Sequence, residues 1–271
     1  MTPLIQNPAR SLLLLATLAF NLPHADADET IPEVTLTDET VSADFILDRV
    51  VKALPQESVS FSGRLRSYEK SAQPQHKARS GLRSSTYQIA VTLNWGQTPP
   101  NASYDISDKN KGLLESMSLK RMPDGQTPAT YTRGPQRTPA ETPALNARIQ
   151  STNLSWSDLS LSFLWWRGGK IIGQDRVKGR SCLVIHVDAP TPGTDSYHHM
   201  KLWIDATYFV LMRAEGYNEE NKIQRRMEVK SLKQFDELWM IKDLQIENLP
   251  SRFRTVLTID ELTIKDATQT P

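Results

Sequence analysis

Alternation of apolar and polar residues runs through most of this chain and limits its fold more than any other feature. In Val59–Arg66 and in Tyr87–Trp95, every second residue is apolar or glycine. Successive side chains of a strand point to opposite faces, so each run predicts a strand with one face on an apolar interior. Shorter strands are predicted near Tyr104–Ile106 and Leu113–Met122.

The C-terminal half repeats this pattern in a series of strands separated by short turns. Its connections contain turn residues, as in Lys178-Gly179 and Asn218–Asn221. Strands joined by short turns pair antiparallel, because a parallel crossover needs about a dozen residues or more. We therefore expect one strongly curved antiparallel sheet. The predicted strands are Gln174–Arg176, Ser181–Asp188, Met200–Asp205, Phe209–Tyr217, Lys222–Lys233, Leu238–Leu249 and Arg252–Leu262.

Two segments have the period of a helix instead. Ala43–Leu54 is amphipathic and is followed by Pro55, which cannot continue a helix. In Ser155–Trp166 the pair Ser155 and Asp158 resembles a capping box, which favours a helix. A strand remains an alternative for this segment, because its leucines also alternate with serines. The residues at helical intervals are Trp156, Leu159, Phe163 and Trp166.

The pattern breaks at Met122–Ala144, which is rich in Pro, Thr, Gly and Ala. Such a segment buries little apolar area, so we predict a long surface loop inserted into the domain. The polar residues 28–42 are predicted to be loosely ordered, and residues 43–265 to form a single β domain.

The N-terminal residues have the features of a secretory signal peptide. Arg10 precedes the apolar run Ser11–Phe20, and Ala25-Asp26-Ala27 is a small-x-small cleavage pattern. The apolar run is too short to span a bilayer, although an uncleaved anchor remains an alternative. No cysteine near the cleavage pattern offers a site for lipid modification. We expect cleavage after Ala27 and a mature protein of 271 − 27 = 244 residues that begins at Asp28.

Charge and cysteine content narrow the range of functions. The formal net charge is +1, from 32 basic and 31 acidic residues, which argues against nucleic acid or an acidic membrane as partner. Cys182 is the one cysteine, so no intramolecular disulfide can form. It lies in the apolar run Cys182–Ile185, where we expect a buried, unreactive thiol.

No arrangement of residues in the sequence points to catalysis. It contains no phosphate-binding glycine loop, nucleophile elbow, HExxH or cysteine-rich metal motif. His198 and His199 would point to opposite faces of a strand and so cannot hold one metal together. His186 lies between apolar neighbours, and Asp158 and Asp205 fit a helix start and a turn. We expect no catalytic, cofactor-binding or metal-binding residues, and no enzymatic activity.

The segment Trp156–Trp166 carries more bulky apolar residues than one stripe of a short helix needs. One interpretation is ordinary core packing. The other is a plug whose inner face lines a ligand cavity. The sequence leaves both open.

Thr152–Ile259 resembles the outer-membrane lipoprotein-sorting proteins, the LolA/LolB-like superfamily, and in particular its longer bacterial members. The helix followed by Phe61–Arg66 also fits the opening of that family. The matching stretches follow in the expected order and are Trp156–Trp166, Val177–Val184, Leu202–Asp205, Leu211–Tyr217 and Arg226–Val229.

The resemblance implies a mainly β protein: an unclosed, strongly curved antiparallel β barrel with a few short helices as a lid over an apolar cavity. In the family that cavity shelters the acyl chains of lipoproteins that cross the periplasm. The implied partners are acyl chains, an inner-membrane transporter and an outer-membrane acceptor, with no cofactor. A binding module for free lipid or exporter cargo on the same fold is the alternative, ahead of an enzyme or a structural periplasmic protein.

Under the resemblance, the apolar faces of the predicted strands and helix would line the cavity. Arg64 or Arg66 on the first strand is the nearest candidate for a cation at the cavity mouth. We expect a periplasmic monomer. The expected lining residues are Leu65, Ile89, Val91, Trp156, Leu159, Phe163, Trp166 and Trp203.

Overall fold

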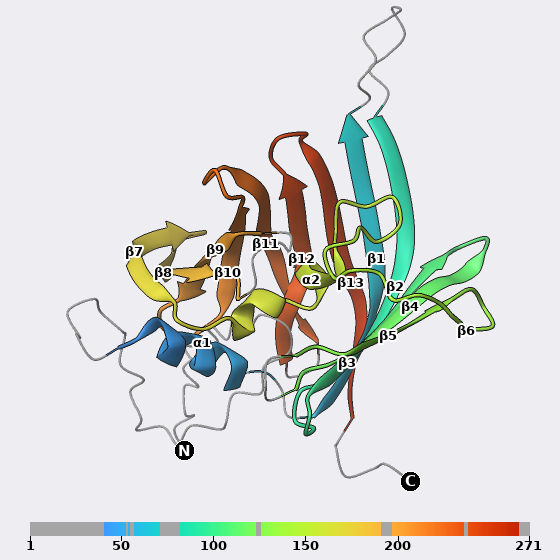
Figure 1. Cartoon of the computed structure of the whole chain (residues 1–271), viewed down its shortest axis with the longest axis horizontal. Helices are drawn as coiled ribbons and strands as arrows, with labels where there is room; N and C mark the ends of the chain where they lie inside the picture. Colours follow the sequence, from blue (N-terminus) through green and yellow to red (C-terminus); the bar gives the residue numbers. More distant parts are fainter. Residues whose placement is uncertain are drawn as a thin grey trace, which may run out of the picture.

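The computed structural model describes residues 41–52, 54, 57–70, 82–122, 126–190, 197–235 and 238–265. The predicted signal peptide lies outside these residues, as do 28–40 of the segment predicted to be loosely ordered. Strands dominate the described part of the chain (Figure 1). They are β1 (Ser58–Lys70), β2 (Leu82–Asn94), β3 (Asn101–Asp108), β4 (Gly112–Lys120), β5 (Ala129–Arg133), β6 (Thr138–Pro139), β7 (Lys170–Val177), β8 (Arg180–Asp188), β9 (His199–Asp205), β10 (Leu211–Tyr217), β11 (Ile223–Phe235), β12 (Leu238–Asn248) and β13 (Phe253–Lys265).

All the strands form one antiparallel sheet in the order β6-β5-β4-β3-β2-β1-β13-β12-β11-β10-β9-β8-β7. It consists of two meanders, β1–β6 and β7–β13, which join where β1 pairs with β13. The edge strands β6 and β7 are not neighbours, so the sheet is unclosed. In Figure 1 the strands turn from upright at β1 and β2 to nearly flat at β7 and β8, which shows the strong curvature. The predicted mainly β, unclosed antiparallel architecture is confirmed.

The two edge strands are consecutive in the sequence, and this determines where the helices lie. After β6 the chain must cross one face of the sheet to reach β7 at the opposite edge. The crossing carries α2 (Trp156–Leu159) and the 3₁₀ helix η1 (Ser162–Trp165). We call residues 145–166 the crossing segment. In Figure 1, α2 lies beside β12 and β13 in the middle of the sheet.

Helix α1 (Ala43–Lys52) covers another part of the same face, beside β7–β10 (Figure 1). The amide of Phe45 donates to Ser42 Oγ (3.1 Å) in its first turn. The apolar residues Ile46, Leu47 and Val50 are buried in the main core, whereas the Phe45 side chain is 50% exposed. The predicted helix is confirmed over Ala43–Lys52.

Alternate residues of the strands build the main core between the sheet, α1 and the crossing segment. Leu65, Ile89 and Ile246 from the sheet are almost completely buried there. A smaller cluster forms on alternate side chains of β8–β10 and includes Cys182 and Trp203. The predicted burial of Cys182 is confirmed, and this burial raises the pKa of its thiol to about 11; its low reactivity stays a prediction.

The prediction of a surface loop at Met122–Ala144 is wrong for its middle part. Residues 129–133 form β5, which pairs with β4, and β6 continues the sheet to its edge. Tyr131 accounts for the difference, because its ring is buried in the main core and its hydroxyl donates to Glu115 (2.6 Å). This buried aromatic residue packs a mostly polar segment against the main core, in addition to its pairing with β4.

The predicted helix over Ser155–Trp166 is confirmed only at its start. Ser155 and Asp158 form the expected capping box. Leu161 then adopts a left-handed conformation with φ of 50°, which interrupts the helix between α2 and η1. This bend lets the segment follow the curved sheet. In the described part of the chain, no helix has the length and apolar character needed to cross a membrane.

Candidate functional site

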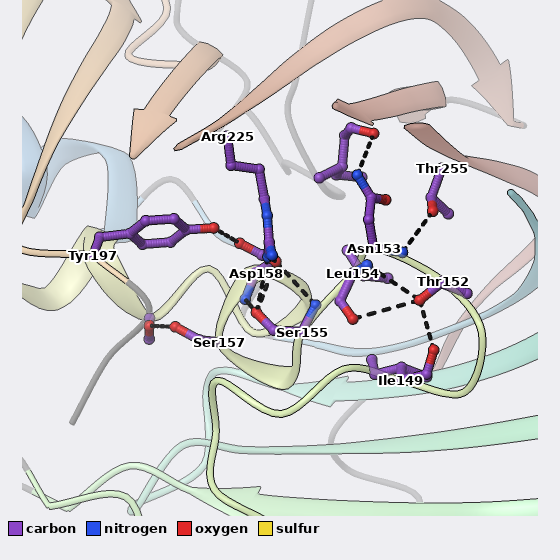
Figure 2. Close-up of polar contacts among 12 residues, drawn as sticks. Ile149, Thr152, Asn153, Leu154, Ser155, Ser157, Asp158, Tyr197, Arg225 and Thr255 are labelled. Carbon is purple, nitrogen blue, oxygen red and sulfur yellow. Dashed lines mark hydrogen bonds and ion pairs between the residues drawn. The ribbon is translucent and has the colours of Figure 1, made fainter. Parts of the chain in front are cut away.

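The first half of the crossing segment is anchored to the sheet through Asn153 (Figure 2). Its side-chain amide donates to the carbonyls of Ile246 (3.2 Å) and Phe253 (2.8 Å). Its backbone amide donates to Thr255 Oγ1 (3.2 Å). Asn153 and Thr255 are buried, so these hydrogen bonds replace the ones that their polar groups would form with water. They attach the loop before α2 to β12 and β13.

A buried ionic network holds the next turn (Figure 2). The Asp158 carboxylate accepts hydrogen bonds from Tyr197 Oη, Arg225 Nη1 and the Ser155 backbone amide. The side chains of Asp158 and Arg225 are 2% and 12% exposed. Burial and the adjacent Asp158 charge hold the pKa of Tyr197 well above its ordinary value, so the phenol stays protonated and donates. Asp158 therefore joins α2 to β11 as well as capping its own helix.

The second half of the crossing segment makes a different kind of contact. The hydrogen bonds that residues 159–166 form within the described part of the chain join them to neighbouring residues of the segment, as in Ser157 Oγ to Ser162 Oγ (2.8 Å), and to the adjacent Arg167. Toward the sheet this half presents apolar side chains, with Leu161, Phe163 and Leu164 buried. Its contact with the sheet is therefore mainly hydrophobic.

An apolar pocket lies between this half of the segment and the sheet. Leu154, Leu159 and Leu161 form its wall on the side of the crossing segment. The free volume between the walls is about 30 Å³, room for about one or two water molecules, so side chains fill most of this space. Ligand pockets are mostly apolar, as this one is, but a ligand larger than a few atoms enters here only if side chains move aside. The sheet contributes Phe61, Val91, Leu93, Leu244, Ile246 and Leu257.

The structure brings most of the predicted lining residues into one region. Val91 and Leu159 line the pocket itself. Trp203 differs: it lies in the smaller cluster with Cys182, where its Nε1 donates to Asp175 (2.9 Å). It faces the other way because it alternates with Leu202, which points into the main core. The predicted residues that belong to the main core around the pocket are Leu65, Ile89, Trp156, Phe163 and Trp166.

Neither candidate for the cavity-mouth cation faces the pocket. Arg64 and Arg66 lie on the solvent-exposed side of β1, opposite Leu65. Arg64 forms a bidentate ion pair with Asp260 on β13, with both distances 2.7 Å. A cation that does lie close to the pocket is Arg225, whose side chain is 12% exposed and whose partner Asp158 lines the pocket. The sequence offered no periodic signal for Arg225, because its partner Asp158 lies 67 residues away in the chain.

Metal-binding chemistry has no site in the described part of the chain, where no group of three His, Cys, Asp or Glu side chains is placed to hold an ion. The rings of His198 and His199 lie 6.0 Å apart in an aromatic cluster instead, with His198 exposed and His199 buried. The ring of His199 stacks on Tyr217 with 4.8 Å between centroids.

Comparison with known proteins connects this architecture to a family. Residues 134–270, just over half of the chain, match a family described as "-like: Uncharacterized protein". The chain belongs to this family. The matched part begins directly after β5, so it contains the crossing segment and the whole meander β7–β13. No curated protein matches the sequence significantly.

Solved structures share the fold over more than four fifths of the chain. A DUF1329 family protein from Desulfovibrio piger has a TM-score of 0.66 at 11% identity, covering 84% of this chain and 93% of that one. A putative outer membrane lipoprotein-sorting protein domain from Vibrio parahaemolyticus gives 0.65 at 12%, covering 83% and 92%. A LolA superfamily protein from Nitrosomonas europaea gives 0.55 at 15%, covering 83% and 94%. The chain thus has the LolA-like fold that its sequence resembles.

Proposed function

We propose that this protein is a periplasmic carrier that shelters the acyl chains of lipoproteins beneath the crossing segment. The observation that supports it best is the apolar pocket between residues 154–161 and the sheet. The fold, shared with a putative lipoprotein-sorting domain and a LolA superfamily protein, is consistent with this role. The signal peptide predicted at residues 1–27 agrees with a periplasmic location.

The energetics of acyl chains favour a pocket of this kind. Each methylene kept from water contributes about 0.8 kcal/mol, so one long chain represents on the order of 10 kcal/mol. A carrier must provide most of this free energy through its own contacts to take up the acyl chain, and must later release the chain. An apolar pocket under a movable cover meets both needs, because its affinity depends on the position of the cover.

In this proposal residues 159–166 are the movable part. They lie over the pocket through apolar contacts, and Leu161 and Phe163 occupy the interior that a long chain would need. Entry of a chain therefore displaces these side chains from the sheet. The chain then takes over their contacts with the apolar wall, so little apolar surface is exposed to water.

A fluorescent fatty-acid titration tests the proposal on the mature protein. Leu159→Glu places a charge in the wall of the pocket, and the bound chain would have to desolvate it. We expect saturable binding by the unmodified protein and its loss in Leu159→Glu. The matched control is Ile172→Glu, because Ile172 is 51% exposed on β7 and away from the pocket lining.

Thermal melts of the variants show whether they stay folded. Absence of saturable binding, or its loss only through unfolding, would contradict the carrier function and favour a filled core. Mass spectrometry of lipids extracted from the purified protein distinguishes a lipoprotein carrier from a module that binds free lipid. Retained free phospholipid would favour the lipid-binding module.

A further inference from the structure

One end of the apolar pocket contains two buried hydrogen-bond donors with no acceptor among the described residues. The Tyr104 side chain is 1% exposed, and its hydroxyl has no such partner. The same holds for the buried Nε1–H of Trp95. Both residues line the pocket beneath the crossing segment. Because buried polar groups in proteins are nearly always paired, these two donors call for an explanation.

A positive charge lies beside the two donors. Trp95, Tyr104 and Arg121 line one small cleft together with Ser160, and this cleft adjoins the apolar pocket through Trp95, Tyr104 and Ser160. The Arg121 guanidinium lies 4.1 Å from the ring centroid of Trp165. That ring is 5.3 Å from the ring of Trp95. Burial strongly raises the pKa of Tyr104, and the Arg121 charge opposes this rise, so the two side chains are close enough to interact.

We infer that Trp95 Nε1, Tyr104 Oη and the Arg121 guanidinium bind the acyl oxygen of the ligand, a carboxylate or an ester carbonyl at the head of the chain. This inference rests on the proposed function and adds which end of the ligand is recognised. Indole and guanidinium groups only donate hydrogen bonds, so the group between them must accept. The cation strengthens such bonds when the acceptor carries negative charge.

The apolar walls orient the rest of the ligand. From Trp95 and Tyr104, the pocket continues between strand residues such as Val91, Leu93 and Ile246. A molecule with one hydrogen-bond acceptor and a hydrocarbon tail can satisfy the donors and fill these walls at the same time. An acyl chain is such a molecule, whereas an alkyl ammonium ion would bring a second set of donors and a second positive charge.

Two tyrosines provide a matched pair for the test. Tyr104 and Tyr131 both place their rings edge-on to Trp156, with centroid distances of 6.4 and 6.3 Å. The Tyr131 hydroxyl donates to Glu115, whereas that of Tyr104 has no partner among the described residues. Each Tyr→Phe change removes one hydroxyl and leaves the ring in place. Only Tyr104→Phe should alter recognition of a ligand.

The experiment is displacement of a fluorescent fatty acid from the purified protein by hexadecanoate, methyl hexadecanoate and hexadecylamine. We expect hexadecanoate to bind the unmodified protein at least about tenfold more tightly than hexadecylamine. Tyr104→Phe should lower the affinity for hexadecanoate by about tenfold, because a hydrogen bond to a charged group is lost. The affinity for hexadecylamine should stay unchanged. Tyr131→Phe should lower thermal stability without changing the order of the ligands.

The methyl ester distinguishes the two sources of an acyl oxygen. If Tyr104→Phe lowers the affinity for methyl hexadecanoate as well as for hexadecanoate, the site recognises the carbonyl of esterified chains, as in lipids and lipoproteins. If it lowers the affinity for hexadecanoate alone, the site recognises the carboxylate of a free fatty acid. Equal affinities for acid and amine, or equal effects of the two Tyr→Phe changes, would overturn the inference while the carrier function stands. Failure of the unmodified protein to bind the fluorescent fatty acid would overturn the carrier function itself.

Discussion

The two halves of the crossing segment lie on the same sheet and are held there in different ways. Residues 145–158 are joined to it by buried directional contacts, through Asn153 and through Asp158. Residues 159–166 cover the pocket with apolar side chains, and their hydrogen bonds within the described part of the chain join them to the segment itself and to the adjacent Arg167. Hydrogen bonds and ion pairs fix a position, whereas apolar contacts can be exchanged for those of a ligand.

This difference suggests a division of roles. The anchored half keeps the segment attached and in register with β11–β13. The apolar half contacts the sheet mainly through apolar side chains, and its described hydrogen bonds join it to the rest of the segment and to Arg167. The left-handed Leu161 lies just after the boundary, between α2 and η1, where the chain is already bent.

The strongest test of the anchored half is Asp158→Ala. The change leaves Arg225 buried without its counter-charge and removes the acceptor of Tyr197. Removing one member of a buried ion pair typically costs about 3–5 kcal/mol, and we expect that loss in urea unfolding. The control is Asp48→Ala, because the pair Asp48–Arg167 beyond the other end of the segment is about half exposed and should contribute only about 0–1 kcal/mol. Equal small losses in both variants would remove the distinction between the two halves.

A smaller loss is expected for Asn153→Ala. The change leaves the carbonyls of Ile246 and Phe253 without this donor in a buried site. An unsatisfied buried polar group costs about 1–3 kcal/mol, which unfolding by urea would resolve. Ser151→Ala in the same loop is the control: Ser151 is exposed, and surface changes usually stay within about 0.5 kcal/mol. A loss no larger than in this control would show that the loop is not anchored by Asn153.

Thiol labelling can compare the mobility of the two halves directly. Cys182 is 1% exposed and burial raises its pKa to about 11, so it should not react at neutral pH in the native protein. A cysteine placed in the segment then reports on local opening. We expect Leu161→Cys to label at least about tenfold faster than Leu154→Cys, a difference of about 1.4 kcal/mol in the free energy of opening. Similar rates would mean that the segment opens as one unit.

The sequence was sufficient to predict the fold because the signal for it is local. Period-two alternation locates the strands wherever one face is buried, as in β1 and β2. Short turns between them then require antiparallel pairing. What alternation cannot supply is the pairing of β1 with β13, which joins the two ends of the domain. No expectation drawn from the sequence or from the resemblance named this pairing.

The candidate site was predicted less well because its contacts join distant parts of the chain. Asp158 fits a helix cap in the sequence, and the structure adds Arg225 from β11 to the same carboxylate. Arg64 was chosen because it lies on the first strand, but alternation with Leu65 already places it on the opposite face. The sequence pattern predicts only a core position for Tyr104. The structure is needed to show that its hydroxyl has no acceptor among the described residues.

The smallest expected effect concerns the exposed pair that Arg64 forms with Asp260. These side chains are 45% and 33% exposed, and exposed pairs contribute about 0–1 kcal/mol. Arg64→Ala should therefore change stability little. It should also leave the affinity for the fluorescent fatty acid unchanged, because Arg64 lies on the face of β1 that points away from the pocket. A loss of binding in this variant at unchanged stability would restore Arg64 as a residue of the cavity mouth.

The pH dependence of this pair gives a second measure. The hydrogen bond and charge of Arg64 hold the pKa of Asp260 below its ordinary value of 3.8. A carboxyl with a lowered folded-state pKa adds stability that is present above 3.8 and disappears as the pH falls through the lower folded value. The difference in unfolding free energy between the unmodified protein and Arg64→Ala should therefore be small at neutral pH and shrink toward zero in acid. A difference that grows in acid would contradict the exposed pairing and place Arg64 in another electrostatic environment.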